Sequence, residues 1–243
     1  MLYFVMHLPS ISEISKAYYP LLTEKAIESL LDVPKEFCLY DKNNISVCWS
    51  PFDYINSNAE IVVVGITPGW QQASIAYEVA ANARKQGLDY LDASKKVKAQ
   101  ASFAGSMRKN LVTMLDDLDV NKYLGIESCS ELFGKYSSKL HTTSALRYPV
   151  FVKGKNYTGH SPNILRHPDL LAITENILSK ELLKISPKII VPLGKAANAC
   201  VEHVMPDCKT SLVLGGFPHP SGANGHRISQ FQLLKESLKN GVL

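Results

Sequence analysis

The fold is decided by the stretch Ile61-Val62-Val63-Val64-Gly65-Ile66-Thr67-Pro68-Gly69-Trp70. Four β-branched residues in a row predict a strand that is buried on both faces, as strands of parallel sheets are. The glycines and the proline that follow end the strand and force a tight turn. A helical pattern then begins at about Ala73. This order places the turn at the carboxyl edge of an α/β sheet, where such folds bind ligands.

A second glycine-rich stretch, Gly215 to Arg227, contains the sequence Phe-Pro-His-Pro-Ser. It follows a predicted strand at Ser211–Leu214 and precedes a predicted helix at Ile228–Leu238. Another buried strand, Lys188–Leu193, leads into a predicted helix that ends at Val204. Because parallel strands end at the same edge of a sheet, we expect the two glycine-rich stretches to meet over one pocket.

Alternating strands and helices predict an α/β fold, with a central, mostly parallel sheet covered by helices on both faces. We expect a single domain over residues 1–243, with residues 1–58 forming an N-terminal helical extension packed on it. The remaining predicted elements are helices at Ile11–Leu31, Ala73–Gly87, Asp92–Ser102, Ser106–Leu118, Ile126–Phe133 and Pro168–Leu183, strands at Ile45–Trp49 and Leu140–Leu146, and a long loop at Tyr148–Asn163.

Composition narrows the class of protein. The chain has 243 residues, of which 46% are hydrophobic, and a net charge of +4, so it can bury a core and is mildly basic. Its five cysteines are odd in number and include no CxxC pair, which predicts a reduced, cytoplasmic protein without disulfides or a zinc ribbon. The short apolar start, Met1–Met6, does not resemble a signal peptide, and no apolar run predicts a membrane span. We expect a monomer.

Commoner chemistries fit these loops less well. A hydrolase nucleophile elbow would use Thr67 as nucleophile and His219 as base, but Pro68 lacks the backbone N–H that the oxyanion needs. The dinucleotide-binding G-x-G-x-x-G and the P-loop lysine motif are both absent. The seven histidines include no HExxH pattern, and we predict no metal site.

The two loops, Gly-x-x-Pro-Gly after the early strand and His-Pro-Ser after the late one, resemble the signature loops of the uracil-DNA glycosylase superfamily. The stretch Ile189–Ala197 is similar to the last core strand and helix of that superfamily. The resemblance extends from Ala59 to Leu238 in the correct order. It implies a three-layer α/β/α sandwich that acts on DNA as a monofunctional glycosylase without a cofactor. One branch carries an iron–sulfur cluster on four cysteines, and the cysteine spacing here does not match it.

The resemblance also implies roles for individual residues. His219 would hydrogen-bond an oxygen of a flipped base and stabilise the negative charge that forms as the glycosidic bond breaks. The residues after it would press on the DNA backbone, and Arg227 would meet a phosphate. The implied DNA contacts are Ser221, Gly222, Ala223, Asn224 and Arg227. The implied base-binding residues are Gly65, Ile66, Gly69, Ser144, Tyr148 and Asn156.

The chain departs from the superfamily pattern in its first loop. Most relatives carry Asp, Asn or Glu there to position water, whereas this chain has Ile66 and Thr67. Thr67 can orient a water but cannot act as a general base near neutral pH, so Gln71, Gln72 or Asp53 is expected to take part. The intercalating Pro-Leu pair after His-Pro-Ser is replaced by Gly-Ala, so the wedge is missing or supplied elsewhere. The predicted catalytic residues are His219, Thr67, Gln72 and Asp53.

A further departure bears on the substrate. Uracil-only enzymes place a bulky tyrosine after the loop proline, whereas Gly69 leaves space beside C5 of the pyrimidine. We therefore expect hydrolysis of the N-glycosidic bond of a flipped uracil or 5-modified pyrimidine, such as hydroxymethylated or glucosylated cytosine in phage DNA, in repair or antiviral defence. The alternatives are a catalytically silent nucleic-acid-binding protein of the same fold and a small-molecule α/β enzyme.

Overall fold

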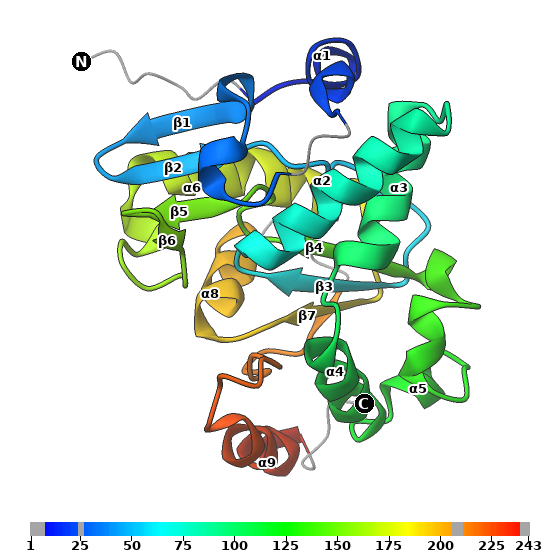
Figure 1. Cartoon of the computed structure of the whole chain (residues 1–243). Helices are drawn as coiled ribbons and strands as arrows, with labels where there is room; N and C mark the ends of the chain where they lie inside the picture. Colours follow the sequence, from blue (N-terminus) through cyan, green and yellow to red (C-terminus); the bar gives the residue numbers. More distant parts are fainter. Residues whose placement is uncertain (1–7, 24–26, 206–210, 239–243) are drawn as a thin grey trace. The chain divides into compact units, whose positions relative to one another are not determined.

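The computed structural model describes residues 8–23, 27–205 and 211–238, which form two compact units (Figure 1). Each unit draws on three stretches of the chain. Unit 1 comprises residues 1–54, 66–102 and 144–178, and unit 2 comprises residues 55–65, 103–143 and 179–243, as far as these are described. One boundary falls between Gly65 and Ile66, so the stretch that decides the fold contributes to both units. The single domain predicted over 1–243 stays a prediction, and Met1–Met6 and Cys208 lie outside the described residues.

Unit 2 is built on a four-stranded sheet with the strand order β4-β3-β7-β8. Strand β3 (Ile61–Gly65) runs parallel to β7 (Ile189–Pro192), which in turn runs parallel to β8 (Leu212–Val213). Strand β4 (Leu140–Ser144) lies on the other side of β3. Every residue of β3 is buried, as its run of β-branched residues predicts. The predicted α/β fold with a parallel sheet is therefore confirmed.

Helices pack on this sheet and hold the loops at its edge. One hydrophobic cluster joins Leu111 and Leu115, Phe231 and Leu234 with alternate residues of β3 and β7. The first pair comes from α4 and the second from α9, whereas α8 contacts β3 and β7 without contributing to this cluster. The helices of unit 2 are α4 (Ser106–Asp116), α5 (Val120–Tyr123), α7 (Lys180–Ile185), α8 (Lys195–Val204) and α9 (Arg227–Leu238).

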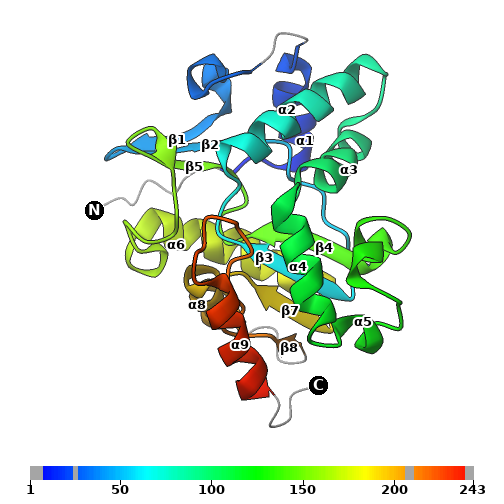
Figure 2. The same cartoon turned by 60° about the horizontal axis from the view of Figure 1, so that its bottom comes forward.

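Unit 1 contains an antiparallel sheet with the order β1-β2-β5-β6. Helices α2 and α3 pack side by side as a hairpin in this unit (Figures 1 and 2). The strands are β1 (Cys38–Lys42), β2 (Ile45–Cys48), β5 (Val150–Val152) and β6 (Lys155–Asn156), and the longer helices are α2 (Trp70–Lys85), α3 (Tyr90–Ala101) and α6 (Pro168–Thr174). Short helical turns, beginning with α1 (Ile11–Glu13), follow one another as far as Leu21.

The antiparallel sheet corrects two predictions. Residues 148–163, predicted as a long loop, contain strands β5 and β6. Residues 1–58, predicted as a helical extension, contain β1 and β2, and the helix predicted to Leu31 ends at Leu21. Strand β2 matches the strand predicted at Ile45–Trp49, whereas β1, β5 and β6 were not predicted. Strands β5 and β6 are only three and two residues long, and β5 pairs with β2 about a hundred residues away, so their local sequence gives little sign of them. The other predicted elements are present with shifted ends, and the turn at Cys129–Phe133 is a 3₁₀ helix.

Candidate active site

His219 belongs to the segment that leaves the carboxyl end of β8 in the parallel sheet of unit 2 and leads to α9. Figure 2 shows the course of this segment. The backbone N–H of Gly194, which follows β7, donates to the carbonyl of Phe217 at 2.8 Å. Gly194 has φ +85° and ψ 168°, a conformation that is essentially restricted to glycine. A Cβ built on Gly194 would lie 3.4 Å from the Cβ of His219. The structure therefore brings the His219 loop close to the backbone at the end of β7.

The hydrogen bonds of the His219 ring define its protonation state. The backbone N–H of Ser221 donates to Nδ1 at 3.3 Å, so Nδ1 presents a lone pair and the ring proton sits on Nε2. Burial lowers the pKa of His219 below its usual 6.5, because a desolvated imidazole resists protonation. At neutral pH the ring is therefore uncharged with an Nε2–H donor. Among the described residues, Ser221 is the one that hydrogen-bonds to the ring.

The residues after His219 form a loop that is held by its own polar groups. Asn224 donates through Nδ2 to the carbonyl of His219 at 3.2 Å, and its Oδ1 accepts from the N–H of His226 at 3.2 Å. Arg227 Nη1 donates to the carbonyl of Ser221 at 3.1 Å. Gly222 and Ala223, at the tip, are exposed. The structure thus brings the five predicted DNA contacts together, and their role in DNA binding stays a prediction.

From Ile66 onward, the predicted site residues of the first loop lie in unit 1, where Thr67 ties two segments together. Its hydroxyl donates to the carbonyl of Tyr148 at 2.8 Å and accepts from the N–H of Val150 at 3.1 Å. The carbonyl of Ile66 accepts from the N–H of Leu146 at 2.9 Å. The hydroxyl proton of Thr67 is thus committed to the protein, and one lone pair of Oγ1 remains to accept from a water. This geometry favours a structural role for Thr67.

Gly69 and Asn156 meet at the start of α2. Asn156 Oδ1 accepts from the N–H of Trp70 at 2.9 Å, so this exposed side chain caps the helix from a distant strand. Gly69 has φ −78° and ψ 169°, a conformation open to any residue. A Cβ on Gly69 would lie 3.6 Å from Asn156 Nδ2, an ordinary contact. Alanine therefore fits at position 69, whereas a larger side chain would have to displace Asn156.

Asp53 is buried in unit 1 and fully engaged. Its Oδ2 accepts from Trp49 Nε1 at 3.1 Å and from the hydroxyl of Tyr90, and its Oδ1 accepts from the hydroxyl of Tyr148. Arg147 Nη1 lies 3.8 Å from Oδ1. Burial, followed by the charge of Asp53, raises the pKa of both tyrosines well above 10, so both remain donors. These contacts favour a structural role for Asp53, and they commit the Tyr148 hydroxyl to Asp53 instead of a base.

The other predicted residues occupy less informative places. Gln72 is half-buried on the first turn of α2, Ser144 is the half-buried last residue of β4, and Gly65 is the buried last residue of β3. No group of three or more His, Cys, Asp or Glu side chains converges into a metal site in the part of the chain that the structure describes. In the same part of the chain, no helix has the length and apolar character needed to cross a bilayer.

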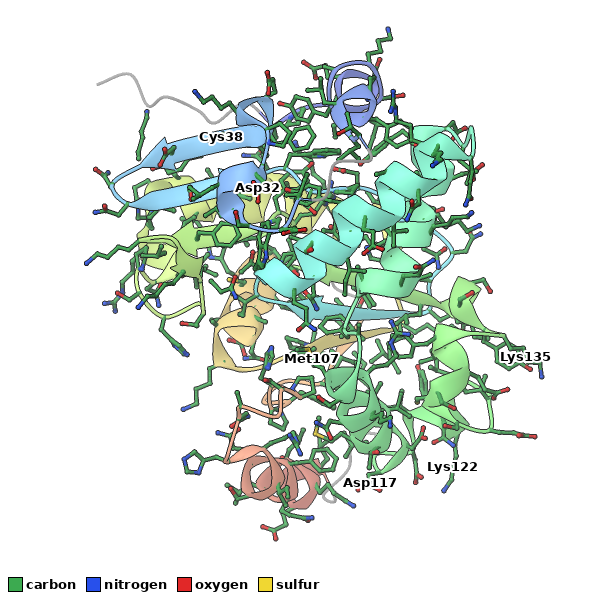
Figure 3. All side chains as sticks on the ribbon, viewed as in Figure 1. Asp32, Cys38, Met107, Asp117, Lys122 and Lys135 are labelled. Carbon is green, nitrogen blue, oxygen red and sulfur yellow. The ribbon has the colours of Figure 1, made fainter. Side chains whose placement is uncertain are left out.

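Near α5, unit 2 carries two exposed lysines that each lie close to a carboxylate. Lys122 and Lys135 point outward from the ribbon (Figure 3). Lys122 Nζ lies 2.9 Å from Asp119, and Lys135 Nζ lies 3.9 Å from Glu131. Mixed charge of this kind does not favour contact of Lys122 and Lys135 with phosphates.

Comparison with known proteins gives the family. The chain is 41% identical over 210 residues to "Uncharacterized protein YoxB" of Bacillus subtilis (strain 168). The aligned residues cover 85% of this chain and 82% of that protein. The chain belongs to the YoxB family. No family model matches it.

Two further residues complete this view of the YoxB-family site, and the sequence prediction did not include them as site residues. Gly194 makes the close approach to His219, and its place directly after a buried strand was the available signal. Asn110 Nδ2 donates to the carbonyl of Pro220 at 2.8 Å. No sequence signal marks Asn110, because a polar residue on a helix is expected to face solvent.

Proposed function

We propose that this YoxB-family protein is a DNA glycosylase that hydrolyses the N-glycosidic bond of a flipped uracil or 5-modified pyrimidine and leaves an abasic site. The observation that carries the proposal is the neutral His219 ring at the carboxyl edge of the parallel sheet, with Nε2–H as its donor. The resemblance of both loops to the uracil-DNA glycosylase superfamily supports it. The helices that pack on the unit 2 sheet are compatible with the three-layer sandwich of that superfamily.

The chemistry requires a donor of this kind. When the C1′–N1 bond breaks, the bonding electrons move to the base and the sugar becomes cationic. Water then adds to C1′ and gives up a proton through solvent, and the base anion takes up one proton and leaves as the neutral base. His219 Nε2–H would hydrogen-bond the base oxygen on which negative charge develops. A neutral donor suits this task because it stays protonated at Nε2 throughout the pH range of the cell. One preorganised donor of this type contributes about 10²–10³ in rate.

Water would need only to be positioned, because the sugar cation is a strong electrophile. Asp53 and Thr67 are engaged in structural bonds. Gln72, half-buried near the start of α2, is the remaining predicted candidate, and its amide can orient a water without accepting its proton. Gly69 supports a substrate with a substituent at C5 because it carries no side chain itself, although the substituent would have to displace Asn156 from its bond to the N–H of Trp70.

One observation favours a second function, a silent nucleic-acid-binding protein of the same fold. The first loop contains no carboxylate, and the hydroxyl of Thr67 is hydrogen-bonded to the backbone. The nearby carboxylate of Asp53 is buried and accepts three hydrogen bonds from side chains. A protein of this kind would keep the polar loop from Ser221 to Arg227 for DNA contact and would release no base.

The two functions are separated by a base-release assay. Purified protein is incubated with duplex and single-stranded oligonucleotides carrying uracil, a thymine mismatch, hydroxymethylcytosine or glucosylated hydroxymethylcytosine, and abasic sites are cleaved with alkali. A glycosylase releases at least one base and loses that activity in His219→Ala, whereas His203→Ala, exposed on α8 and outside the DNA-contact loop, serves as the matched control. DNA binding without release from any substrate supports the silent protein. Failure to bind DNA at all contradicts both.

A further inference from the structure

We propose that Asn110 is a positioning residue that sets the orientation and tautomer of the His219 ring through the peptide between Pro220 and Ser221. The inference rests on the proposed function for its catalytic meaning, but its structural part can be tested without any substrate.

A single planar peptide links Asn110 to the ring. Asn110 Nδ2 donates to the carbonyl of Pro220 at 2.8 Å. The amide of that same peptide is the N–H of Ser221, which donates to His219 Nδ1 at 3.3 Å. Because the peptide is rigid and planar, fixing the direction of its carbonyl also fixes the direction of its N–H. Asn110 thus controls the donor that keeps the proton off Nδ1 and on Nε2.

Proline makes this control effective. The ring of Pro220 locks its φ, so ψ of Pro220 is the one soft torsion that rotates the following peptide. The bond from Asn110 restrains that torsion. Hydrogen bonds in series also polarise one another, so the Asn110 bond makes the Ser221 N–H a better donor.

Asn110 is itself firmly placed. It lies on α4 directly before Leu111, which is fully buried in the hydrophobic cluster of unit 2. Its own side chain is half-buried. From the other side of the loop, Asn224 Nδ2 holds the carbonyl of His219 at 3.2 Å. Two asparagine amides therefore hold successive carbonyls of the His-Pro-Ser turn, one of them from an anchored helix.

The test compares Asn110→Leu, which removes the donor at similar volume, with Asn121→Leu as a matched control. Asn121 lies in the same unit and also donates through Nδ2 to a backbone carbonyl, that of Glu127, at 2.8 Å. The His219 ring is observed by heteronuclear NMR of ¹⁵N-histidine-labelled protein and assigned by the loss of its signals in His219→Gln. The wild type and Asn121→Leu should show the Nε2–H tautomer. Asn110→Leu should show a mixture of both tautomers and a pKa closer to 6.5.

A His219 spectrum of Asn110→Leu that matches the wild type overturns the inference, whether or not base release is ever found. Should Asn110→Leu fail to fold, Asn110→Asp keeps the volume while replacing the amide donor by a carboxylate, and the same tautomer shift is expected. If base release is established, the Asn110→Leu rate at saturating substrate should fall about two- to tenfold with KM unchanged. Absence of release from every substrate, with the tautomer shift present, contradicts only the proposed function.

Discussion

Replacing Asp53 should reveal a structural carboxylate in unit 1. The side chain is 3% exposed and accepts from Trp49, Tyr90 and Tyr148, with Arg147 nearby. Asp53→Ala leaves two hydroxyls and an indole N–H facing a cavity and removes the acceptor charge beside the arginine. Asp53→Asn keeps one acceptor oxygen and turns the other into an NH₂ group, which can donate a hydrogen bond to one of the tyrosine hydroxyl oxygens.

The expected magnitude follows from these partners. Each buried donor left unsatisfied costs about 1–3 kcal/mol, which gives an upper range of about 3–9 kcal/mol for three. Water that enters the cavity restores part of this, and removing one partner of a buried charged pair typically costs about 3–5 kcal/mol. We therefore expect Asp53→Ala to lower the free energy of unfolding by about 3–5 kcal/mol, and Asp53→Asn by less than half of that.

Tryptophan fluorescence during urea unfolding measures this directly, because both tryptophans, Trp49 and Trp70, belong to unit 1. The exposed Asp92→Ala on α3 is the control and should change the free energy of unfolding by no more than about 0.5 kcal/mol. A loss below about 1 kcal/mol in Asp53→Ala would refute the reasoning and return Asp53 to the list of water-positioning candidates.

The remaining predictions concern unit 2. Gly194→Ala should lower the free energy of unfolding by about 1–3 kcal/mol, because φ +85° strains any residue with a side chain, and it should slow base release with DNA binding intact if relief of that strain shifts the adjoining His219 loop; unchanged release would contradict this. Because the pKa of His219 is lowered in the folded state, its contribution to stability should be complete above about pH 6.5 and decline as the pH falls below that value. Urea unfolding of wild type and His219→Gln at a series of pH values tests the direction of this change. Glu181→Ala should cost about 3 kcal/mol or more in unfolding followed by circular dichroism, because the carboxylate is buried and bound by His141 at 2.6 Å and Thr143 at 2.9 Å; a loss under about 1 kcal/mol would be inconsistent with this.

The sequence predicted the parts of the fold that depend on local pattern. The β-branched run from Ile61 to Val64 predicted a buried parallel strand, and the apolar spacing of α2, α3, α4 and α8 predicted those helices. Such patterns suffice because the hydrophobic periodicity that marks the buried face of a strand or helix lies within that element's own sequence.

Pairings between distant segments could not be predicted in this way. Strands β5 and β6 are short, and Lys155–Asn156 has no hydrophobic pattern, so only pairing along the antiparallel sheet makes it a strand. The N–H of Trp70, the first residue of α2, donates to Asn156, which lies far along the chain. Asn110 likewise acquires its role from a carbonyl that lies 110 residues away.

Within the candidate site, the sequence predicted His219 as a functional residue but did not predict the protonation state of its ring. The neutral ring follows from the Ser221 N–H and from burial, both of which exist only in the folded loop. Asp53 shows the opposite case: its sequence position beside the first loop made it a candidate for water activation, whereas its partners in the structure favour a structural role.

The most direct test of the account is single-turnover base release by wild type and His219→Ala. The substrate is whichever oligonucleotide loses its test base to the wild type, and DNA affinity is measured in parallel. The account predicts that release slows about 10²–10³-fold in His219→Ala while DNA affinity stays within a few-fold of wild type. An equal rate in the two proteins, or no release by the wild type of any of the four test bases, would contradict it.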